Sequence, residues 1–296
     1  MTQLQEIFSA RSWLFAPGDS EKKMQKATAS DADVVLIDLE DAVTEAEKPR
    51  AREMVATFLK TQADDSSRLW VRINPLRGPH ALTDLAAVMP GRPGGIMLPK
   101  SRGPEDLIEL DHYLLAFEAV NGIAAGSTRV FPLITETAEG MFTTGSYAGA
   151  PRLTAMTWGA EDLADALGAS DNKNPDGSYG FTYELARSLC LCGAAAAGVA
   201  AIDTIHGDFR DLEGLRQRAT QCRRAGFRGM LAIHPAQVDV INEAFTPTEA
   251  EIAEAWEIVK LFAAKPGVGA IGYKGGMLDR PHLARAQALL RLAGQT

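Results

Sequence analysis

The sequence predicts an α/β protein built as a (β/α)8 TIM barrel, followed by a C-terminal helical extension. Eight short apolar runs recur along the chain, amphipathic stretches alternate with them, and polar residues end the runs. Near-continuous apolar runs are typical of strands that are covered on both faces, as in a parallel sheet. Because each run is followed by a crossover and no single Gly-rich phosphate turn dominates, a closed barrel is favoured over an open doubly wound sheet.

The expected elements follow one another in a repeated β-then-α order. The strands are expected at residues 13–16, 34–39, 69–73, 95–99, 130–134, 155–158, 200–205 and 230–233. The clearest crossover helices are expected at residues 21–29, 47–60, 105–120, 183–197 and 212–225. This alternation of strands and helices is the signature of βαβ units.

The chain continues beyond the eighth strand, so residues 1–245 are expected to form the barrel and residues 246–296 an extension. The extension comprises a helix over 247–264, a Gly-rich segment over 265–276 and a last helix over 280–292. Thr246 is expected to cap the first of these helices, with Pro247 at its first position and Glu249 three residues after the cap. Residues 267–272 match GxGxxG, but they follow a helix instead of a strand, which favours a turning or mobile linker over a dinucleotide site.

The composition of the chain argues against some classes of binding partner. The 296 residues include 30 basic and 38 acidic side chains, for a net charge of −8, which argues against a nucleic-acid partner. No apolar run approaches the roughly 18 residues that span a membrane, and the first residues lack a secretion signal, so we expect no membrane partner and a cytoplasmic location. The three cysteines are expected to be buried, reduced thiols, with no disulfide framework or zinc site.

Chemically active side chains are expected where the strands end, because the active site of such a barrel lies at the C-terminal ends of its strands. The residues found there, in strand order, are Asp38, Glu40, Asp41, Arg72, Asn74, Lys100, Glu136, Glu161, Asp162, Asp203 and His234.

Two of these acids point to a metal ion. Glu136 and Asp162 end adjacent strands of the predicted barrel. Two carboxylates without nearby cysteine and with few histidines suit a hard cation, Mg²⁺ with Mn²⁺ as a substitute. The alternative is that both are solvated loop acids or helix caps.

Two other strand-end residues have two interpretations each. Arg72 suits a carboxylate or oxyanion ligand, or else forms a structural ion pair with an acid at the end of the second strand. His234 is either a base or a hydrogen-bonded structural group.

Eight motifs together carry a resemblance to a known family. In order along the chain they are RSWLFAPGD (11–19), DLEDAV (38–43), VRIN (71–74), LPK (98–100), ETAEG (136–140), GAEDL (159–163), AIHPAQ (232–237) and GMLDRPH (276–282). With them, the chain resembles the citrate lyase β-subunit-like family of the HpcH/HpaI aldolase superfamily, whose members include malyl-CoA and citramalyl-CoA lyases. Within this superfamily, Glu40 and Asp41 stand where the aldolase branch carries Glu-His, and this favours the thioester branch. One departure is Arg228-Gly229-Met230, where many relatives carry Gly-Lys.

The resemblance implies a set of roles at the site. Glu136 and Asp162 would hold Mg²⁺, Arg72 would bind the 2-oxo acid, and Asp279 would be the acid/base. In relatives the segment that carries this aspartate closes over the barrel of a neighbouring subunit. A homo-oligomer is therefore expected, a trimer or a dimer of trimers, with the extension reaching a neighbouring subunit.

The resemblance also implies how the substrate is held. Phe15 and Lys26 would contact the CoA part of the substrate, and Glu161 would lie at the substrate site. The basic side chains near the first helix, including Lys26, equally suit solubility alone.

The implied reaction is the reversible cleavage of a 3-hydroxyacyl-CoA thioester, of the malyl-, citramalyl- or citryl-CoA type, into acetyl-CoA and a 2-oxo acid. Two alternatives stay open. One is a thioesterase that hydrolyses malyl-CoA with the same metal site. The other is a β subunit that acts on an acyl-carrier thioester inside a citrate lyase complex.

Overall fold

The computed structural model describes residues 10–295, except for the side chains of residues 63–65. The chain divides into two compact units, Met1–Asn242 and Glu243–Thr296. The first contains the predicted barrel and the second the helices that follow it.

The first unit contains eight parallel strands. They are β1 (Ser12–Pro17), β2 (Val34–Asp38), β3 (Leu69–Arg72), β4 (Gly95–Leu98), β5 (Arg129–Pro132), β6 (Ala155–Thr157), β7 (Ala200–Asp203) and β8 (Gly229–Ala232). Their hydrogen-bonded order is β5-β4-β3-β2-β1-β8-β7-β6. Parallel bridges between Val130 and Leu153 and between Leu133 and Thr157 join the two ends of this sheet into a nearly closed barrel. The predicted fold class is confirmed, and all eight predicted strands are present.

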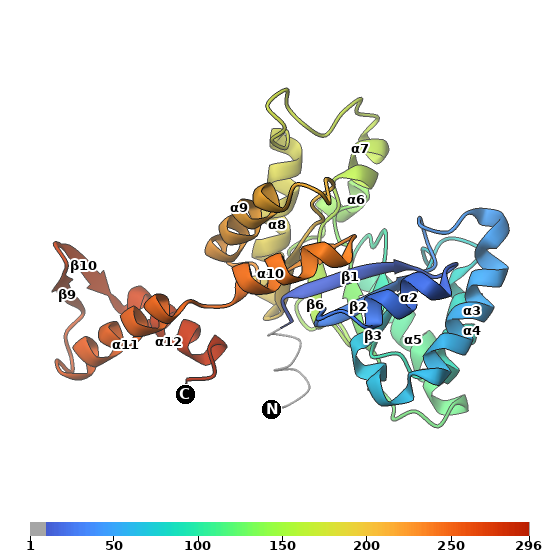
Figure 1. Cartoon of the computed structure of the whole chain (residues 1–296), viewed down its shortest axis with the longest axis horizontal. Helices are drawn as coiled ribbons and strands as arrows, with labels where there is room; N and C mark the ends of the chain where they lie inside the picture. The colour runs from blue at the N-terminus through green and yellow to red at the C-terminus, as the bar shows by residue number, and fades with distance from the viewer. Residues whose placement is uncertain (1–9, 296) are drawn as a thin grey trace. The chain divides into compact units, whose positions relative to one another are not determined.

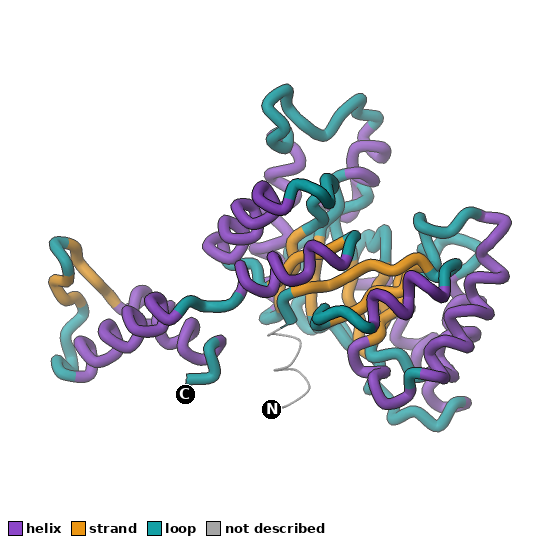
Figure 2. Tube along the Cα trace, in the orientation of Figure 1, coloured by secondary structure: helices purple, strands orange, loops and turns teal. Residues whose placement is uncertain are grey.

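Helices surround these strands, as Figure 2 shows by their colours. The α-helices are α2 (Glu21–Thr28), α3 (Lys48–Thr61), α4 (Ala81–Val88), α5 (Pro104–Val120), α6 (Ala138–Met141), α7 (Glu161–Leu167), α8 (Phe181–Ala197), α9 (Leu212–Ala225) and α10 (Val238–Phe245). Short 3₁₀ helices are η1 (Glu45–Glu47), η2 (Ala63–Arg68), η3 (Met89–Gly91) and η4 (Pro235–Gln237). In the first unit, α2 to α5 cover one side of the strands, and α8 and α9 cover another (Figure 1). Among the described residues, no helix is both long and apolar enough to cross a membrane.

The barrel interior is filled by large side chains at its N-terminal end. Trp13 packs edge-on against Trp70, with ring centroids 5.3 Å apart, and lies 4.5 Å from the ring of Phe131. Gly95 leaves the space that this packing needs, because a Cβ there would lie 2.4 Å from the Trp70 ring. Side chains along a strand point alternately into the barrel and away from it. Phe15, two positions beyond Trp13, therefore also faces inward, nearer the C-terminal end. The corresponding inward positions of β2 and β3 hold polar residues.

The second unit consists of α11 (Glu249–Ala263), β9 (Ala270–Tyr273), β10 (Gly276–Asp279) and α12 (Arg280–Leu292). The two helices pack through a cluster that includes Ala255, Ala286 and Leu290. A second cluster joins Phe262 of α11 to the hairpin residues Ile271 and Leu278.

Two expectations for this unit were wrong. The Gly-rich segment is not simply a linker, because β9 and β10 pair as an antiparallel hairpin. Lys274 and Gly275 both have positive φ, 45° and 80°, which suits the tight turn between the two strands. The cap of α11 is Thr248 instead of Thr246, because Thr248 and Glu251 form the reciprocal capping box.

The cysteines also differ in part from the expectation. All three are free thiols, but only Cys190 and Cys222 are buried, and Cys192 is exposed. Cys190 lies on the face of α8 that contacts the barrel, together with Ala186 and Ala194. Cys192 is two positions further along the helix and therefore lies on a different face.

Candidate active site

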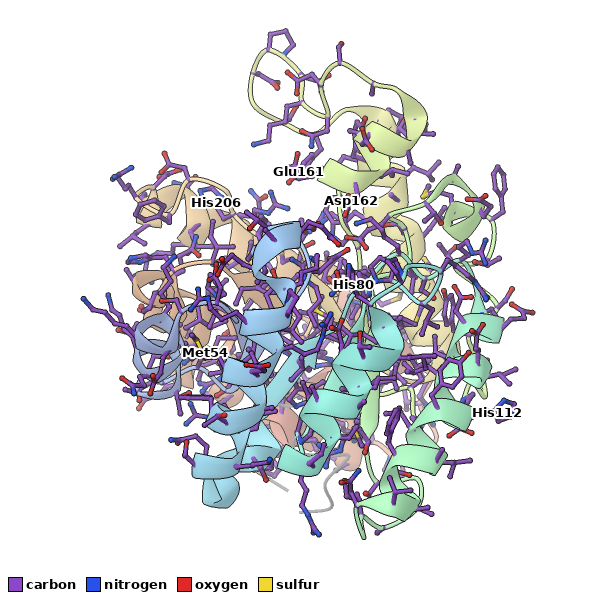
Figure 3. The ribbon with its side chains drawn as sticks, turned by 90° about the vertical axis from the view of Figure 1, so that its right-hand side faces the viewer. Met54, His80, His112, Glu161, Asp162 and His206 are labelled. Carbon is purple, nitrogen blue, oxygen red and sulfur yellow. The ribbon has the colours of Figure 1, made fainter. Side chains whose placement is uncertain are left out.

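A pocket of about 430 Å³ opens at the C-terminal ends of the barrel strands. Its lining residues come from most of the strands and the loops that follow them. They are Phe15, Pro17, Asp38, Asp41, Ala42, Arg72, Leu133, Glu136, Gly159, Ala160, Glu161, Asp162, Thr204, Ile205, Leu231 and Ile233. Five of the predicted site residues are thus brought together, namely Phe15, Arg72, Glu136, Glu161 and Asp162. Figure 3 shows Glu161 and Asp162 at the start of α7, below the loop that leads to α8.

Two predicted residues are not among those that line the pocket. Lys26 is an exposed residue on α2. Asp279 belongs to the second unit, where it is the N-cap of α12 and forms a capping box with His282. Its side chain contacts the Nδ1 atom of His282, and this hydrogen bond lowers the pKa of Asp279 below the ordinary aspartate value. Asp279 is therefore ionised at neutral pH.

Arg72 is held rigidly at the bottom of the pocket. The register of β2 and β3 pairs it with Asp38, and its Nε and Nη2 atoms donate to the two carboxylate oxygens of Asp38 at 2.7 and 2.6 Å. Burial opposes the charge of Asp38, but the Arg72 guanidinium and backbone N–H groups outweigh it and lower the pKa of Asp38. The ring of Phe15 lies 4.9 Å from the Arg72 Cζ. The structural ion pair suggested by the sequence is present, and it also orients the guanidinium in the pocket.

Arg72 has two further acidic neighbours. Its Nη1 atom lies 2.9 Å from Glu40 Oε2 and 3.4 Å from Asp41 Oδ2. Asp41 is the exposed partner, with 57% of its side chain accessible, whereas Glu40 is 5% accessible. The contact to Asp41 is the longest and most solvated of the three, so it is the one that another anion could replace at least cost.

Lys100 links the second strand to the sixth. Its Nζ atom donates to Glu40 Oε1 and to Asp162 Oδ2, each at 2.9 Å. Its backbone N–H donates to Glu136 Oε2 at 2.7 Å. The residue has φ of 51°, a left-handed conformation that is uncommon for a residue with a side chain. One residue thus contacts all three of the acids Glu40, Glu136 and Asp162.

Glu136 carries a charge that its surroundings disfavour. Its side chain is buried, and Gly159 packs so closely that a Cβ on Gly159 would lie 3.1 Å from Glu136 Oε1. Burial and the nearby charges of Asp162 and Glu40 raise the pKa of Glu136 well above the ordinary glutamate value. Burial likewise raises the pKa of Glu40 to about 7, although Arg72 and Lys100 oppose this rise.

The carboxyl groups of this site outnumber its cations. Five acids, on β2, on the β2 loop and at the ends of β5 and β6, surround the two cations Arg72 and Lys100. Burial, together with the nearby charges of Asp162 and Glu40, raises the pKa of Glu136 within this cluster. All the acidic donors are oxygens, which suits a hard divalent cation such as Mg²⁺. Glu136 and Asp162 therefore fit the metal-binding role that the sequence suggested.

Within residues 10–295, no three acidic, histidine or cysteine side chains converge on a common metal position in their present arrangement. The ammonium group of Lys100 lies between two of these acids, Glu40 and Asp162. The sequence placed Lys100 among the strand-end residues without a role, and Glu40 only as one of the acids that could pair with Arg72. The signal that could have identified Lys100 is its place directly after the fourth strand, level with the acids.

Two other strand-end residues serve the structure. Asp203 is fully buried and accepts hydrogen bonds from Trp158 Nε1, at 2.5 Å, and from Arg187 Nε, at 3.3 Å. It lies on the face of β7 that packs against helices, since the neighbouring Ile202 belongs to the interior cluster. His234 caps η4 through its Nδ1 atom, which accepts from the N–H of Ala236, so its structural interpretation is favoured.

The raised pKa of Glu136 predicts how the metal-free protein responds to pH. A carboxyl group with a folded-state pKa above its unfolded value stabilises the fold fully below about pH 4.5, and this contribution is lost as the pH rises through the folded pKa. Glu136→Gln stays neutral at every pH. The Tm of this variant should exceed that of the wild type by about 3 °C or more at pH 8 and by less at pH 5. Thermal unfolding in EDTA measures the difference, with the exposed Glu139→Gln as the control.

A Tm of Glu136→Gln that is below that of the wild type at pH 8 would contradict this account. So would a difference that does not change between pH 5 and pH 8.

The close packing of Gly159 gives a second prediction. In Gly159→Ala the new Cβ has to displace Glu136 by a few tenths of an ångström. The affinity for Mg²⁺ should fall about tenfold, because metal ligands tolerate little displacement, while the fold is kept. Calorimetric titration measures the affinity. Gly145→Ala is the control, since a Cβ there meets no atom within 4 Å, and an unchanged affinity of Gly159→Ala would remove Gly159 from the site.

Comparisons with known proteins place the chain among relatives. Residues 11–235 match the HpcH/HpaI aldolase/citrate lyase family. A citrate lyase subunit beta-like protein of Mycobacterium tuberculosis is 35% identical over 283 residues, covering 96% of this chain and 95% of that protein. A (3S)-malyl-CoA thioesterase of Cereibacter sphaeroides is 35% identical, covering 96% and 94%. The mitochondrial citramalyl-CoA lyase of Mus musculus is 33% identical, covering 96% and 86%.

A solved structure extends the likeness to three dimensions. It is that of protein CitE from Mycobacterium tuberculosis in complex with magnesium, acetoacetate and coenzyme A, with a TM-score of 0.81 at 35% identity. The match covers 97% of this chain and 98% of that chain. The family match and these relatives, which span nearly the whole chain, show that the chain belongs to the HpcH/HpaI aldolase/citrate lyase family.

Proposed function

We propose that this chain is a Mg²⁺-dependent carbon–carbon lyase. It cleaves a 3-hydroxyacyl-CoA thioester of the malyl-, citramalyl- or citryl-CoA type, reversibly, into acetyl-CoA and a 2-oxo acid. The observation that carries the proposal is the meeting of Glu136, Asp162 and Arg72 at one pocket at the end of the barrel. It is supported by relatives that include a citramalyl-CoA lyase and by a similar structure that binds magnesium, acetoacetate and coenzyme A.

Glu136 and Asp162 are the proposed ligands of the metal. When bound, Mg²⁺ supplies Lewis-acid charge for the oxygens of the substrate, and Mn²⁺ has the same preference for oxygen ligands. The two carboxylates come from neighbouring strands, and Glu136 is fixed from two sides by the Lys100 N–H and by Gly159.

Arg72 is the proposed anchor for the 2-oxo acid part of the substrate. Its Nε and Nη2 atoms are committed to Asp38, which leaves Nη1 and its solvated contact with Asp41 facing the pocket. A substrate carboxylate that replaces Asp41 at Nη1 gains a charge-assisted hydrogen bond and loses only an exposed one. The rigid hold of Asp38 then fixes the orientation of the substrate.

Asp279 is the proposed acid/base. In cleavage, the Asp279 carboxylate takes the proton of the substrate hydroxyl, the bond between the hydroxyl-bearing carbon and the thioester α-carbon breaks, and its electron pair remains on the α-carbon as an enolate. Asp279 in its acid form protonates that carbon to give acetyl-CoA, and in the reverse direction the carboxylate removes the same proton. The lowered pKa of Asp279 favours the carboxylate that the reverse direction needs. We propose that this aspartate acts in an oligomer, a trimer or a dimer of trimers, at the pocket of a neighbouring subunit.

The remaining predicted residues would contact the thioester. Phe15 lines the pocket beside Leu231 and Ile233, so the apolar side of the pocket suits the acyl and pantetheine parts of the substrate. Lys26 is exposed on α2 and carries charge for the CoA phosphates. Glu161 lines the pocket and is oriented by Asn172, whose Nδ2 donates to it at 2.7 Å.

A thioesterase is the second candidate, because the malyl-CoA thioesterase of Cereibacter sphaeroides is also 35% identical to this chain over nearly its full length. The same pocket would then direct water to the thioester carbonyl. A third candidate is a subunit that needs an acyl-carrier partner, since the citrate lyase β subunit of Leuconostoc mesenteroides is 34% identical.

The products distinguish these candidates. The purified protein is incubated with Mg²⁺ and, in separate samples, malyl-CoA, citramalyl-CoA and citryl-CoA, and the products are identified by mass spectrometry. We expect acetyl-CoA and a 2-oxo acid from at least one substrate, and no reaction in EDTA. Free CoA with the intact hydroxy acid would instead establish the thioesterase, and no EDTA-sensitive product would favour the carrier-dependent subunit.

The shared-site role of Asp279 has its own test. Asp279→Ala and Arg72→Ala should each lower turnover by about 10³-fold or more, while Asp279→Ala still binds Mg²⁺. When the two inactive variants are mixed and exchange subunits, some oligomers combine an intact Arg72 with an intact Asp279. Part of the activity should therefore return. Mixed oligomers that stay inactive, with exchange confirmed by native mass spectrometry, would contradict a site shared between subunits.

A further inference from the structure

We propose that Lys100 is the built-in counter-ion of the metal-free site and leaves Asp162 when the divalent cation binds. The proposal rests on the metal site of the proposed function and goes beyond it, because it assigns a role in metal affinity to a side chain that is not a metal ligand. Its consequence is that metal binding in this protein is an exchange of one cation for another.

The position of the Lys100 ammonium group carries the argument. It lies 2.9 Å from Glu40 Oε1 and 2.9 Å from Asp162 Oδ2, so it already makes the contact with Asp162 that a metal ion would make. The backbone N–H of the same residue donates to Glu136 Oε2 at 2.7 Å. Lys100 thus contacts all three acids.

The backbone holds Lys100 in this position against its local preference. A left-handed φ of 51° is favoured for glycine, yet a lysine occupies it. In this conformation the N–H donates to Glu136 while the side chain contacts Asp162. Both ends of the residue therefore serve the same cluster of acids.

The partners of Glu40 indicate which contact breaks. Glu40 pairs with Arg72 through Oε2, at 2.9 Å, and with Lys100 through Oε1. Its side chain is 5% accessible, so loss of Lys100 would leave a buried carboxylate with less compensation, whereas Asp162 is 27% accessible. Lys100 consequently stays with Glu40 and gives up Asp162, because the metal replaces it there.

The ion pair between Lys100 and Asp162 stabilises the metal-free protein and lowers its affinity for a metal ion. Without Lys100, Asp162 and Glu136 would repel each other with less compensation until a metal bound. With Lys100, a metal ion has to displace an ion pair and then share the site with a neighbouring positive charge. Removal of the ammonium group alone should therefore strengthen metal binding and weaken the metal-free fold.

Lys100→Met tests this, because methionine is similarly long and uncharged and keeps the backbone N–H to Glu136. In calorimetric titration, Lys100→Met should bind Mg²⁺ about tenfold or more tightly than the wild type. Its Tm should be below that of the wild type in EDTA, and the gap should close in saturating Mg²⁺, since a ligand that binds only the folded state raises Tm. Lys60→Met, which removes one exposed charge from the last turn of α3, is the matched control and should change neither quantity.

Every result of this experiment either supports or overturns the proposed exchange. An affinity within twofold of the wild type, weaker binding, or a loss of Tm that is the same with and without Mg²⁺ would overturn the exchange. If Lys100→Met does not fold in EDTA, the proposal predicts that Mg²⁺ restores folding, and failure to do so overturns it. If the wild type itself binds no divalent cation, both the proposed metal site and the exchange at Lys100 are overturned, whereas binding by the wild type with an unchanged affinity in Lys100→Met overturns the exchange alone.

A double-mutant cycle separates the pair from a general packing role. In EDTA, the Tm loss caused by Lys100→Met should shrink in the Asp162→Asn background, because the charge that Lys100 compensates is gone. Equal losses in both backgrounds would show that Lys100 acts without Asp162 and would overturn the proposal.

Discussion

The structure depends on one constraint: several carboxyl groups lie close together at the mouth of the barrel, and their negative charges have to be compensated. Parallel strands bring their C-terminal ends to one rim, and in this chain those ends carry acids on β2 and after β5 and β6. Arg72 and Lys100 hold these acids together, so that two cations contact a larger number of carboxyl groups. We propose that this imbalance favours the binding of a divalent cation.

The barrel supplies the precision that this arrangement needs. The interior is filled by Trp13, Trp70 and Phe131, and the same inward-facing rows continue upward into the pocket. Because β2 and β3 are paired in register, Asp38 and Arg72 lie opposite each other without any loop to position them. The part of the site on strands is thus fixed by packing, whereas Asp162 and Glu161 are placed by the first turn of α7.

Much of this arrangement could be predicted from the sequence, because it follows from periodicity. The eight apolar runs locate the strands, and the strand ends locate Arg72, Glu136 and Asp162 at one pocket. What could not be predicted depends on contacts between distant residues or on local backbone geometry. The role of Lys100 could not be predicted, because it depends on contacts with Glu40 and Asp162, about 60 positions away on either side. It also depends on a positive φ, which no sequence pattern predicts.

Other differences have equally local causes. The Gly-rich segment forms a hairpin because Lys274 and Gly275 both adopt positive φ, which aligns two short apolar strands on Phe262. Asp203 lies at a strand end like the other candidates, but the alternation of side chains along β7 directs it to Trp158 and Arg187, outside the barrel interior. A place at the end of a strand therefore identifies a residue as a candidate for the site. Because successive side chains point to opposite faces of the strand, only those on the inward face reach the pocket.

The central claim is that an uncompensated cluster of carboxyl groups at the barrel mouth binds one divalent cation. The most direct measurement is a calorimetric titration of the wild type with Mg²⁺ near pH 7, in two buffers that differ in protonation enthalpy. A carboxyl group with a raised pKa has to lose its proton when the metal binds, so the account predicts one Mg²⁺ per chain with release of protons that diminishes as the pH rises. Absence of binding, or binding without proton release near pH 7, would contradict it.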